Sequence, residues 1–140
     1  MNYQIQGLPV YAQVHGTAEP ALAFLHYWGG TSRTWRKVTA ELEGQFKTVA
    51  YDARGWGKSD KTLAGYKLAD LADEALSLVK ALGIKQYFLV GHSMGGKVAA
   101  RSIAETEGAS RPHSSGSCSA NASAQSRRNA SRAASCVRQA

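Results

Sequence analysis

The chain has 140 residues, is 44% hydrophobic and carries a net charge of +7, values that suit one globular domain. No run of about 18 apolar residues occurs, and the N-terminus lacks a basic start followed by an apolar stretch. The sequence therefore argues against a transmembrane segment or a secretion signal and favours the cytoplasm. Cys118 and Cys136 have no histidine at a zinc-like spacing around them, so neither a disulfide framework nor a metal site is expected.

The composition changes abruptly near residue 105. All Trp, Tyr and Phe residues precede that point, whereas residues 106–140 hold nine Ser, eight Ala and, among large aliphatics, only Val137. Because only the first part has the apolar side chains for a core, we expect a folded body over 1–105 and a disordered Ser/Ala/Arg-rich tail over 106–140. Arginines in the tail allow nonspecific contact with phosphates, but no aromatic residue is present there to stack a base. No specific nucleic-acid partner is therefore expected.

Two short strands open the body, at residues 2–6 and 8–15, where apolar and polar residues alternate on either side of Gly7. Their spacing predicts an antiparallel hairpin. The next apolar run, "ALAFLH" at 21–26, is continuous, which is typical of a strand buried on both faces.

A helix and another strand follow. Thr31 or Ser32 can cap a helix that runs over about 33–43, and "QFKTVAYD" at 45–52 reads as the next strand. The helix side chains spaced to face a sheet are Trp35, Val38 and Leu42.

The last part of the body repeats this alternation. Apolar residues recur at helical spacing from 68 to 82, Gly83 ends that helix, and "QYFLV" at 86–90 is a strand that leads into another helix. The order of elements predicts an α/β fold with a mostly parallel sheet, an antiparallel N-terminal hairpin and helices on both faces. In such sheets the chemistry lies past the carboxyl ends of the strands, where His26, Asp52 and Ser93 stand.

The segment Gly91-His92-Ser93-Met94-Gly95 fits the pattern G-x-S-x-G. This pattern places a serine in a strained turn between a strand and a helix, so the positions two before and two after it must lack bulk. The helix N-terminus offers free N–H groups and a partial positive charge that favour an oxyanion. The segment therefore predicts that Ser93 is a nucleophile.

Three segments together resemble the α/β-hydrolase superfamily over about residues 3–105: "HYWGG" at 26–30, "DARGWGKSD" at 52–60 and "GHSMGGKVA" at 91–99. The resemblance implies an oxyanion hole made by the N–H groups of Trp28 and Met94. Tyr27 stands where the family usually has glycine, which leaves Tyr27 as the alternative donor.

The resemblance also implies supporting roles near the nucleophile. Asp52 is similar to the aspartate that orders the loop after the fourth strand. In the family the catalytic acid follows the serine in the chain, whereas Asp52 precedes Ser93, so Asp52 is not expected to be the catalytic acid. His26 is expected to orient its own loop, and His92 to flank the nucleophile. Gly91 and Gly95 complete the nucleophile elbow, which is the turn from strand to helix that carries Ser93.

A base and an acid for Ser93 are not evident. After Ser93 the only histidine is His113 and the only acids are Glu105 and Glu107, all at the edge of the tail or inside it. A serine hydroxyl is a poor nucleophile unless an imidazole takes its proton and a carboxylate holds that imidazole. We therefore expect the chain to be inactive or nearly so.

The tail has a possible origin in an altered reading frame. Codons for residues 111–122, read from their second nucleotide, permit "GLILVAPAPPTP", a parallel-type strand followed by a loop. We hypothesise a frameshift near Glu105 that replaced the remaining strands, the lid, the acid and the histidine. Loss of the next strand is expected to leave the edge of strand 86–90 unpaired and the chain prone to self-association.

The sequence thus indicates a truncated serine hydrolase that acts on small esters or related acyl compounds through an acyl-serine intermediate, with no cofactor, metal or membrane. Dehalogenase chemistry is disfavoured because those relatives use an aspartate where Ser93 stands, whereas esterase, perhydrolase and carbon–carbon hydrolase activities remain open. The alternative is a non-catalytic binding or regulatory protein that keeps the hydrolase sheet and uses its basic tail as a contact.

Overall fold

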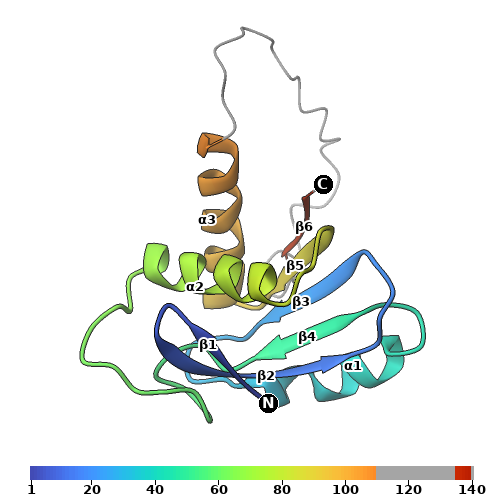
Figure 1. The fold of residues 1–140 in the computed structure, drawn as a ribbon, viewed down its shortest axis with the longest axis horizontal. Helices are drawn as coiled ribbons and strands as arrows, with labels where there is room; N and C mark the ends of the chain where they lie inside the picture. Colours follow the sequence, from blue (N-terminus) through green and yellow to red (C-terminus); the bar gives the residue numbers. More distant parts are fainter. Residues whose placement is uncertain (110–134, 140) are drawn as a thin grey trace, which may run out of the picture.

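The computed structural model describes residues 1–109 and 135–139. Within these residues six strands form one mixed sheet in the order β1-β2-β4-β3-β5-β6 (Figure 1). The elements in chain order are β1 (Asn2–Ile5), β2 (Leu8–His15), β3 (Ala21–Leu25), the 3-10 helix η1 (Ser32–Trp35), α1 (Arg36–Leu42), β4 (Thr48–Tyr51), α2 (Leu68–Ala81), β5 (Tyr87–Gly91), α3 (Met94–Ala109) and β6 (Ser135–Gln139).

The predicted opening hairpin is confirmed. β1 and β2 pair antiparallel, with Ile5 opposite Leu8. The two residues between them, Gln6 and Gly7, have φ angles of 53° and 78°. Positive φ at both positions of a two-residue loop matches the twist of a hairpin. β2 also pairs antiparallel with β4, while β3 is parallel to both β4 and β5, so the centre of the sheet is parallel as expected.

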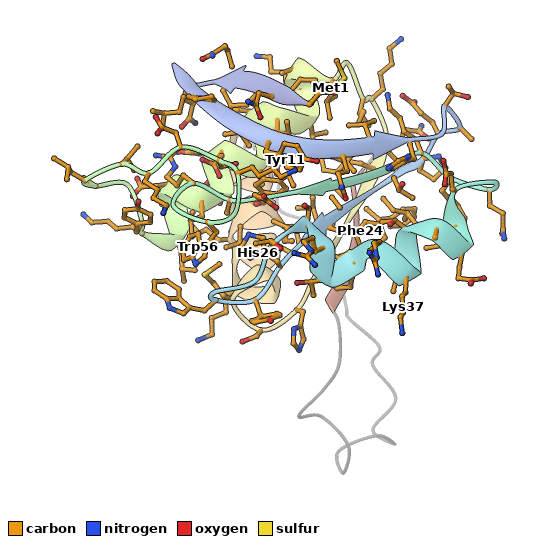
Figure 2. All side chains as sticks on the ribbon, turned by 90° about the horizontal axis from the view of Figure 1, so that it is seen from below. Met1, Tyr11, Phe24, His26, Lys37 and Trp56 are labelled. Atoms are coloured by element: carbon orange, nitrogen blue, oxygen red, sulfur yellow. The ribbon has the colours of Figure 1, made fainter. Side chains whose placement is uncertain are left out.

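β3 shows how helices cover both faces of the sheet. Ala21, Ala23 and Leu25 lie in the core with α2 and α3. Phe24 points to the opposite face and packs against Trp35, with ring centroids 5.1 Å apart. The two helical layers therefore lie on opposite sides of the sheet (Figures 1 and 2). The predicted α/β architecture is confirmed.

The helix expected over 33–43 is divided into η1 and α1, and one of its expected inward residues is wrong. Trp35 is buried and Leu42 packs, partly buried, against its cluster as expected, but Val38 is 41% exposed and Thr39 is buried in its place. The hydroxyl of Thr39 bonds to the carbonyl of Trp35 at 3.2 Å, so its polar atom is satisfied inside the fold. Trp35, Thr39 and Leu42 thus form the inward face, at spacings of four and three residues.

The start of η1 is stabilised by a tertiary contact instead of a side-chain cap. Thr31 occupies the N-cap position in an extended conformation, but its side chain makes no capping bond. The amide of Ser32 instead donates to Oδ1 of Asp52 at 2.6 Å. The expected capping by Thr31 or Ser32 is therefore wrong, because a carboxylate from the next strand end satisfies the free N–H.

The predicted end of α2 at Gly83 is confirmed. Gly83 has φ of +65°, and its amide bonds to the carbonyl of Lys80 at 3.0 Å. At the other end, the amide of Lys67 donates to the Asp70 carboxylate at 3.0 Å. An acid in the first turn also favours the positive end of the helix dipole.

The C-terminal part differs from expectation in two ways. α3 continues to Ala109, beyond the boundary at 105, and β6 pairs antiparallel with β5, with Leu89 opposite Val137. The expected unpaired edge of β5 is therefore wrong. An antiparallel partner can come from any distance along the chain, and composition gives no signal for it. The rest of the tail, including His113 and Cys118, lies outside the described residues.

Across the part of the chain that the structure describes, no helix combines the length and the apolar character needed to cross a bilayer.

Candidate active site

The turn between β5 and α3 holds Ser93 in a strained conformation. β5 ends at Gly91 and α3 begins at Met94, so the turn between them consists of His92 and Ser93. Ser93 has φ of +54°, in the left-handed region that non-glycine residues rarely adopt. Such a residue costs about 1–3 kcal/mol and persists only where its surroundings impose it.

Hydrogen bonds on both sides impose this turn. The amide of His92 donates to the carbonyl of Leu25 at 3.2 Å, which ties the turn to the end of β3. The amides of Gly95 and Gly96 donate to the carbonyls of His92 and Ser93, each at 3.0 Å. Ser93 is therefore placed by the sheet and by the first turn of α3 together.

Glycine is required at both flanking positions by close backbone contact. A Cβ on Gly91 would lie 2.3 Å from the carbonyl carbon of Gly95. A Cβ on Gly95 would lie 2.2 Å from the carbonyl oxygen of Leu25. Neither neighbour is a flexible side chain, so neither can move aside without displacing a strand or a helix.

Of the two expected oxyanion donors, Met94 begins α3 and Trp28 lies on the loop after β3. Met94 is the first residue of α3, and the amide of such a residue has no acceptor within its own helix. The loop that carries Trp28 is closed by a bond of 2.8 Å from the amide of Gly30 to the carbonyl of Tyr27. The Tyr27 ring meets the His92 ring edge to face, with centroids 5.4 Å apart. This contact brings the loop of residues 26–30 beside the elbow.

His26 supports this loop as a neutral ring. Its Nε2 accepts the amide of Ala53 at 3.0 Å, so its proton resides on Nδ1, which donates to the carbonyl of Tyr27 at 2.8 Å. Burial lowers the pKa of His26 from 6.5, and the bond to Tyr27 and the charge of Asp52 oppose this only in part. Because both ring nitrogens are engaged, His26 has no free nitrogen to act as a base for Ser93.

Both carboxylate oxygens of Asp52 accept hydrogen bonds from backbone amides. Oδ1 accepts the amide of Ser32 at 2.6 Å and Oδ2 accepts the amide of Lys58 at 2.8 Å. Gly57 packs so closely that a Cβ there would lie 2.0 Å from Oδ2. These contacts are those of a residue that orders the loop after β4, and neither carboxylate oxygen is hydrogen-bonded to a histidine.

A buried ion pair beneath the loop after β4 was missed by the sequence reasoning. Nε of Arg54 donates to Oε2 of Glu74 at 2.7 Å, and the Arg54 amide donates to Oε1 at 3.0 Å. Burial raises the pKa of Glu74 above 4.5, and the bonds with Arg54 oppose that rise. A signal was present, because Glu74 interrupts the apolar face of α2 between Leu71 and Leu78.

Aromatic rings form a second support for the site. The Trp56 ring contacts His26, Trp28 and Tyr66, with centroids 5.8, 5.0 and 5.9 Å away. His26 and Trp56 come from different loops at the same end of the sheet (Figure 2). Trp28 is 65% exposed, so this aromatic cluster reaches the surface beside the elbow.

In residues 1–109 no histidine is hydrogen-bonded to the Ser93 hydroxyl. Ser93 and His92 are exposed, the nitrogens of His26 are engaged, and His15 lies at the far end of β2, where Nδ1 is 3.3 Å from Glu43. His113 is outside the described residues. Among the described side chains, no group of three or more His, Cys, Asp or Glu is placed to hold a metal ion.

This elbow, its two adjoining loops and the mixed sheet are features of the α/β-hydrolase fold. A family model described as the alpha/beta hydrolase fold matches residues 20–114. The chain therefore belongs to the α/β-hydrolase family.

Individual relatives have different named activities. RutD of Variovorax paradoxus, provisionally named a carbamate hydrolase, is 36% identical over 94 residues, which are 65% of this chain and 35% of RutD. A soluble epoxide hydrolase of Corynebacterium is 35% identical over 95 residues, which are 68% of this chain and 33% of that protein. The solved structure of an esterase from Exiguobacterium antarcticum matches with a TM-score of 0.70 and 25% identity, covering 74% of this chain and 39% of that one. The chain spans about a quarter to a third of the length of the curated relatives it matches.

Proposed function

We propose that this chain carries the nucleophile and oxyanion-hole half of a serine hydrolase that acts on esters or related acyl compounds. The observation that carries the proposal is the strained backbone of Ser93, with φ of +54° between two glycines that no larger residue can replace. Strain of this kind at an exposed polar residue is typical of a functional site.

The chemistry assigned to Ser93 is acyl transfer. Its Oγ attacks the acyl carbonyl carbon while its proton passes to a base, and the negative charge on the carbonyl oxygen is held by amides of the oxyanion hole. The bond to the leaving alcohol then breaks, and the departing oxygen takes up a proton. Water afterwards hydrolyses the acyl-serine ester and releases the acid. Met94 and Trp28 are the amide donors in this proposal, with Tyr27 as the alternative on the second loop.

A serine at the elbow disfavours epoxide opening as the reaction. Attack of a serine oxygen on an epoxide carbon would leave an ether, which water does not hydrolyse under mild conditions. Attack on an acyl carbon leaves an ester, which water does hydrolyse. The named activity of the esterase relative therefore fits this nucleophile better than that of the epoxide hydrolase.

The chain alone is proposed to react slowly, because no imidazole in residues 1–109 is hydrogen-bonded to the Ser93 hydroxyl. The oxyanion hole and substrate binding can retain some acceleration when other catalytic groups are lost. This shortage of a base also favours the second candidate, a non-catalytic binding protein on the hydrolase scaffold. The two candidate functions differ in whether an added base increases the rate at which Ser93 reacts.

External imidazole provides the test. The full chain is incubated with a fluorophosphonate probe, with and without imidazole, and the modified peptide is identified by mass spectrometry. We expect slow labelling of Ser93 that imidazole accelerates, with no labelling of Ser93→Ala. Ser77→Ala, which removes a hydroxyl on α2, serves as the matched control and should label normally.

Labelling that maps to another residue, or that imidazole leaves unchanged and slow, would contradict the nucleophile assignment. Rapid labelling without imidazole would contradict the proposed lack of a base.

A further inference from the structure

A groove of about 440 Å³ lies beside the loop of residues 26–30 and the helices that follow it. Its volume falls in the range of roughly 300–1,000 Å³ typical of small-molecule sites. Gly29, Gly30 and Thr31 line it, together with the basic residues Arg33, Arg36 and Lys37 of η1 and α1. It is an open, polar groove, unlike the apolar pockets that hold neutral ligands.

The groove is strongly cationic. Relative to Arg33, the residues Arg36 and Lys37 follow three and four positions later. They therefore lie on the same side of the η1–α1 segment as Arg33. The residues that line the groove include no acid. In residues 1–109, none of these three side chains takes part in an ion pair or hydrogen bond. The three charges are therefore not neutralised by the fold itself, and Figure 2 shows Lys37 extending from α1 away from the sheet.

The groove also adjoins the elbow. Tyr27 lines it and meets the His92 ring at 5.4 Å, next to Ser93. Trp28, a proposed oxyanion donor, lies between Tyr27 and Gly29, which both line the groove. A ligand in the groove would thus touch the same loop that is proposed to bind the reacting carbonyl.

From these observations we propose that the groove binds the carboxylate or phosphate group of a small acyl substrate whose reacting carbonyl lies at Ser93. Anion binding is inferred from the groove alone. The placement of the reacting carbonyl at Ser93 rests on the proposed hydrolase function. Two guanidinium groups suit planar, bidentate contact with carboxylate or phosphate oxygens, and the lysine adds a mobile point charge.

Anion binding is tested first, on the full chain at low ionic strength. Inorganic phosphate and glutarate are titrated separately by calorimetry. We expect one site, weakened at least about tenfold in Arg33→Gln/Arg36→Gln/Lys37→Gln and weakened by added salt. The matched control, Lys61→Gln/Lys80→Gln/Lys85→Gln, removes the same charge from exposed positions elsewhere and should bind as the unmodified chain does.

The outcomes distinguish the sources of the anion. Binding of phosphate alone assigns a phosphorylated ligand, and binding of glutarate alone assigns a carboxylate. Binding of neither, equal weakening in both triple variants, or binding only to a single-stranded oligonucleotide would overturn the proposal.

The link to Ser93 needs a second readout. Two fluorophosphonate probes of equal length, one ending in a carboxylate and one in a carboxamide, are compared in the presence of imidazole. We expect the carboxylate probe to label Ser93 about tenfold faster, and the groove variant to lose this preference; a preference that persists in the variant overturns the link. Ser93→Ala should still bind glutarate, so failure of the hydrolase function and failure of the groove are separable.

Discussion

The backbone N–H of Ala53 donates to Nε2 of His26 at 3.0 Å and thereby joins the loop after β3 to the loop after β4. This bond requires the neutral ring, because a protonated Nε2 would be a second donor facing the Ala53 N–H. Protonation of His26 would therefore break the contact that supports the loop of residues 26–30.

The stability of the fold should depend on pH through His26. Its pKa in the folded chain lies below 6.5, so between the two values the unfolded chain binds more protons. The contribution of neutral His26 is fully present above about pH 6.5 and is lost as the pH falls below it. Urea unfolding of the unmodified chain and of His26→Gln, measured at several pH values from about 5 to 8, should show a smaller loss in the variant. Identical pH profiles would show that His26 does not carry this dependence.

The elbow glycines should tolerate no side chain. Gly95→Ala is expected to lower the free energy of unfolding by about 3 kcal/mol or more, because its Cβ would overlap the Leu25 carbonyl. Gly44 is the matched control, since a Cβ there would meet nothing within 4 Å. Gly44→Ala should be neutral or stabilising by about 0.5 kcal/mol. Denaturant unfolding measures both, and equal effects would contradict the packing of α3 against β3.

Ser93 should be a site where stability and reactivity oppose each other. Ser93→Gly is expected to stabilise the chain by about 1 kcal/mol, because glycine adopts positive φ without strain. Ser93→Ala keeps the Cβ and should leave the stability nearly unchanged. Thermal unfolding of the two variants separates loss of the hydroxyl from relief of strain. If the glycine variant is no more stable than the alanine variant, the turn is not strained.

Removing one partner of the Arg54–Glu74 ion pair should lower the stability of the fold more than replacing both partners together. Glu74 is fully buried, and Arg54 is 8% exposed. Glu74→Leu is expected to cost about 3–5 kcal/mol, since it leaves the Arg54 charge buried and unpaired. The double variant Arg54→Met/Glu74→Leu should be more stable than Glu74→Leu alone. A double-mutant cycle measures this coupling, and additive losses would contradict it.

Local signals predict much of the fold. The hairpin around Gly7, the end of α2 at Gly83 and the strand-to-helix turn at Ser93 follow from short-range patterns, and the structure agrees with each. The errors arise where distant segments decide. Val38 was expected inward from helical spacing, but Thr39 is the residue buried against the sheet. Capping by Thr31 was expected from its residue type, but Asp52 competes for the Ser32 amide.

The sequence by itself determined the α/β class, the position of the serine and the two glycines beside it, because strand and helix periods and the steric demands of a tight turn are local properties. Only the tertiary structure decided the protonated nitrogen of His26, the engagement of both Asp52 oxygens and the pairing of β6 with β5. Each of these depends on atoms that are far apart in the chain and meet only when the sheet forms. Hydrogen bonding, charge and packing between such atoms have no signature in a single stretch of sequence.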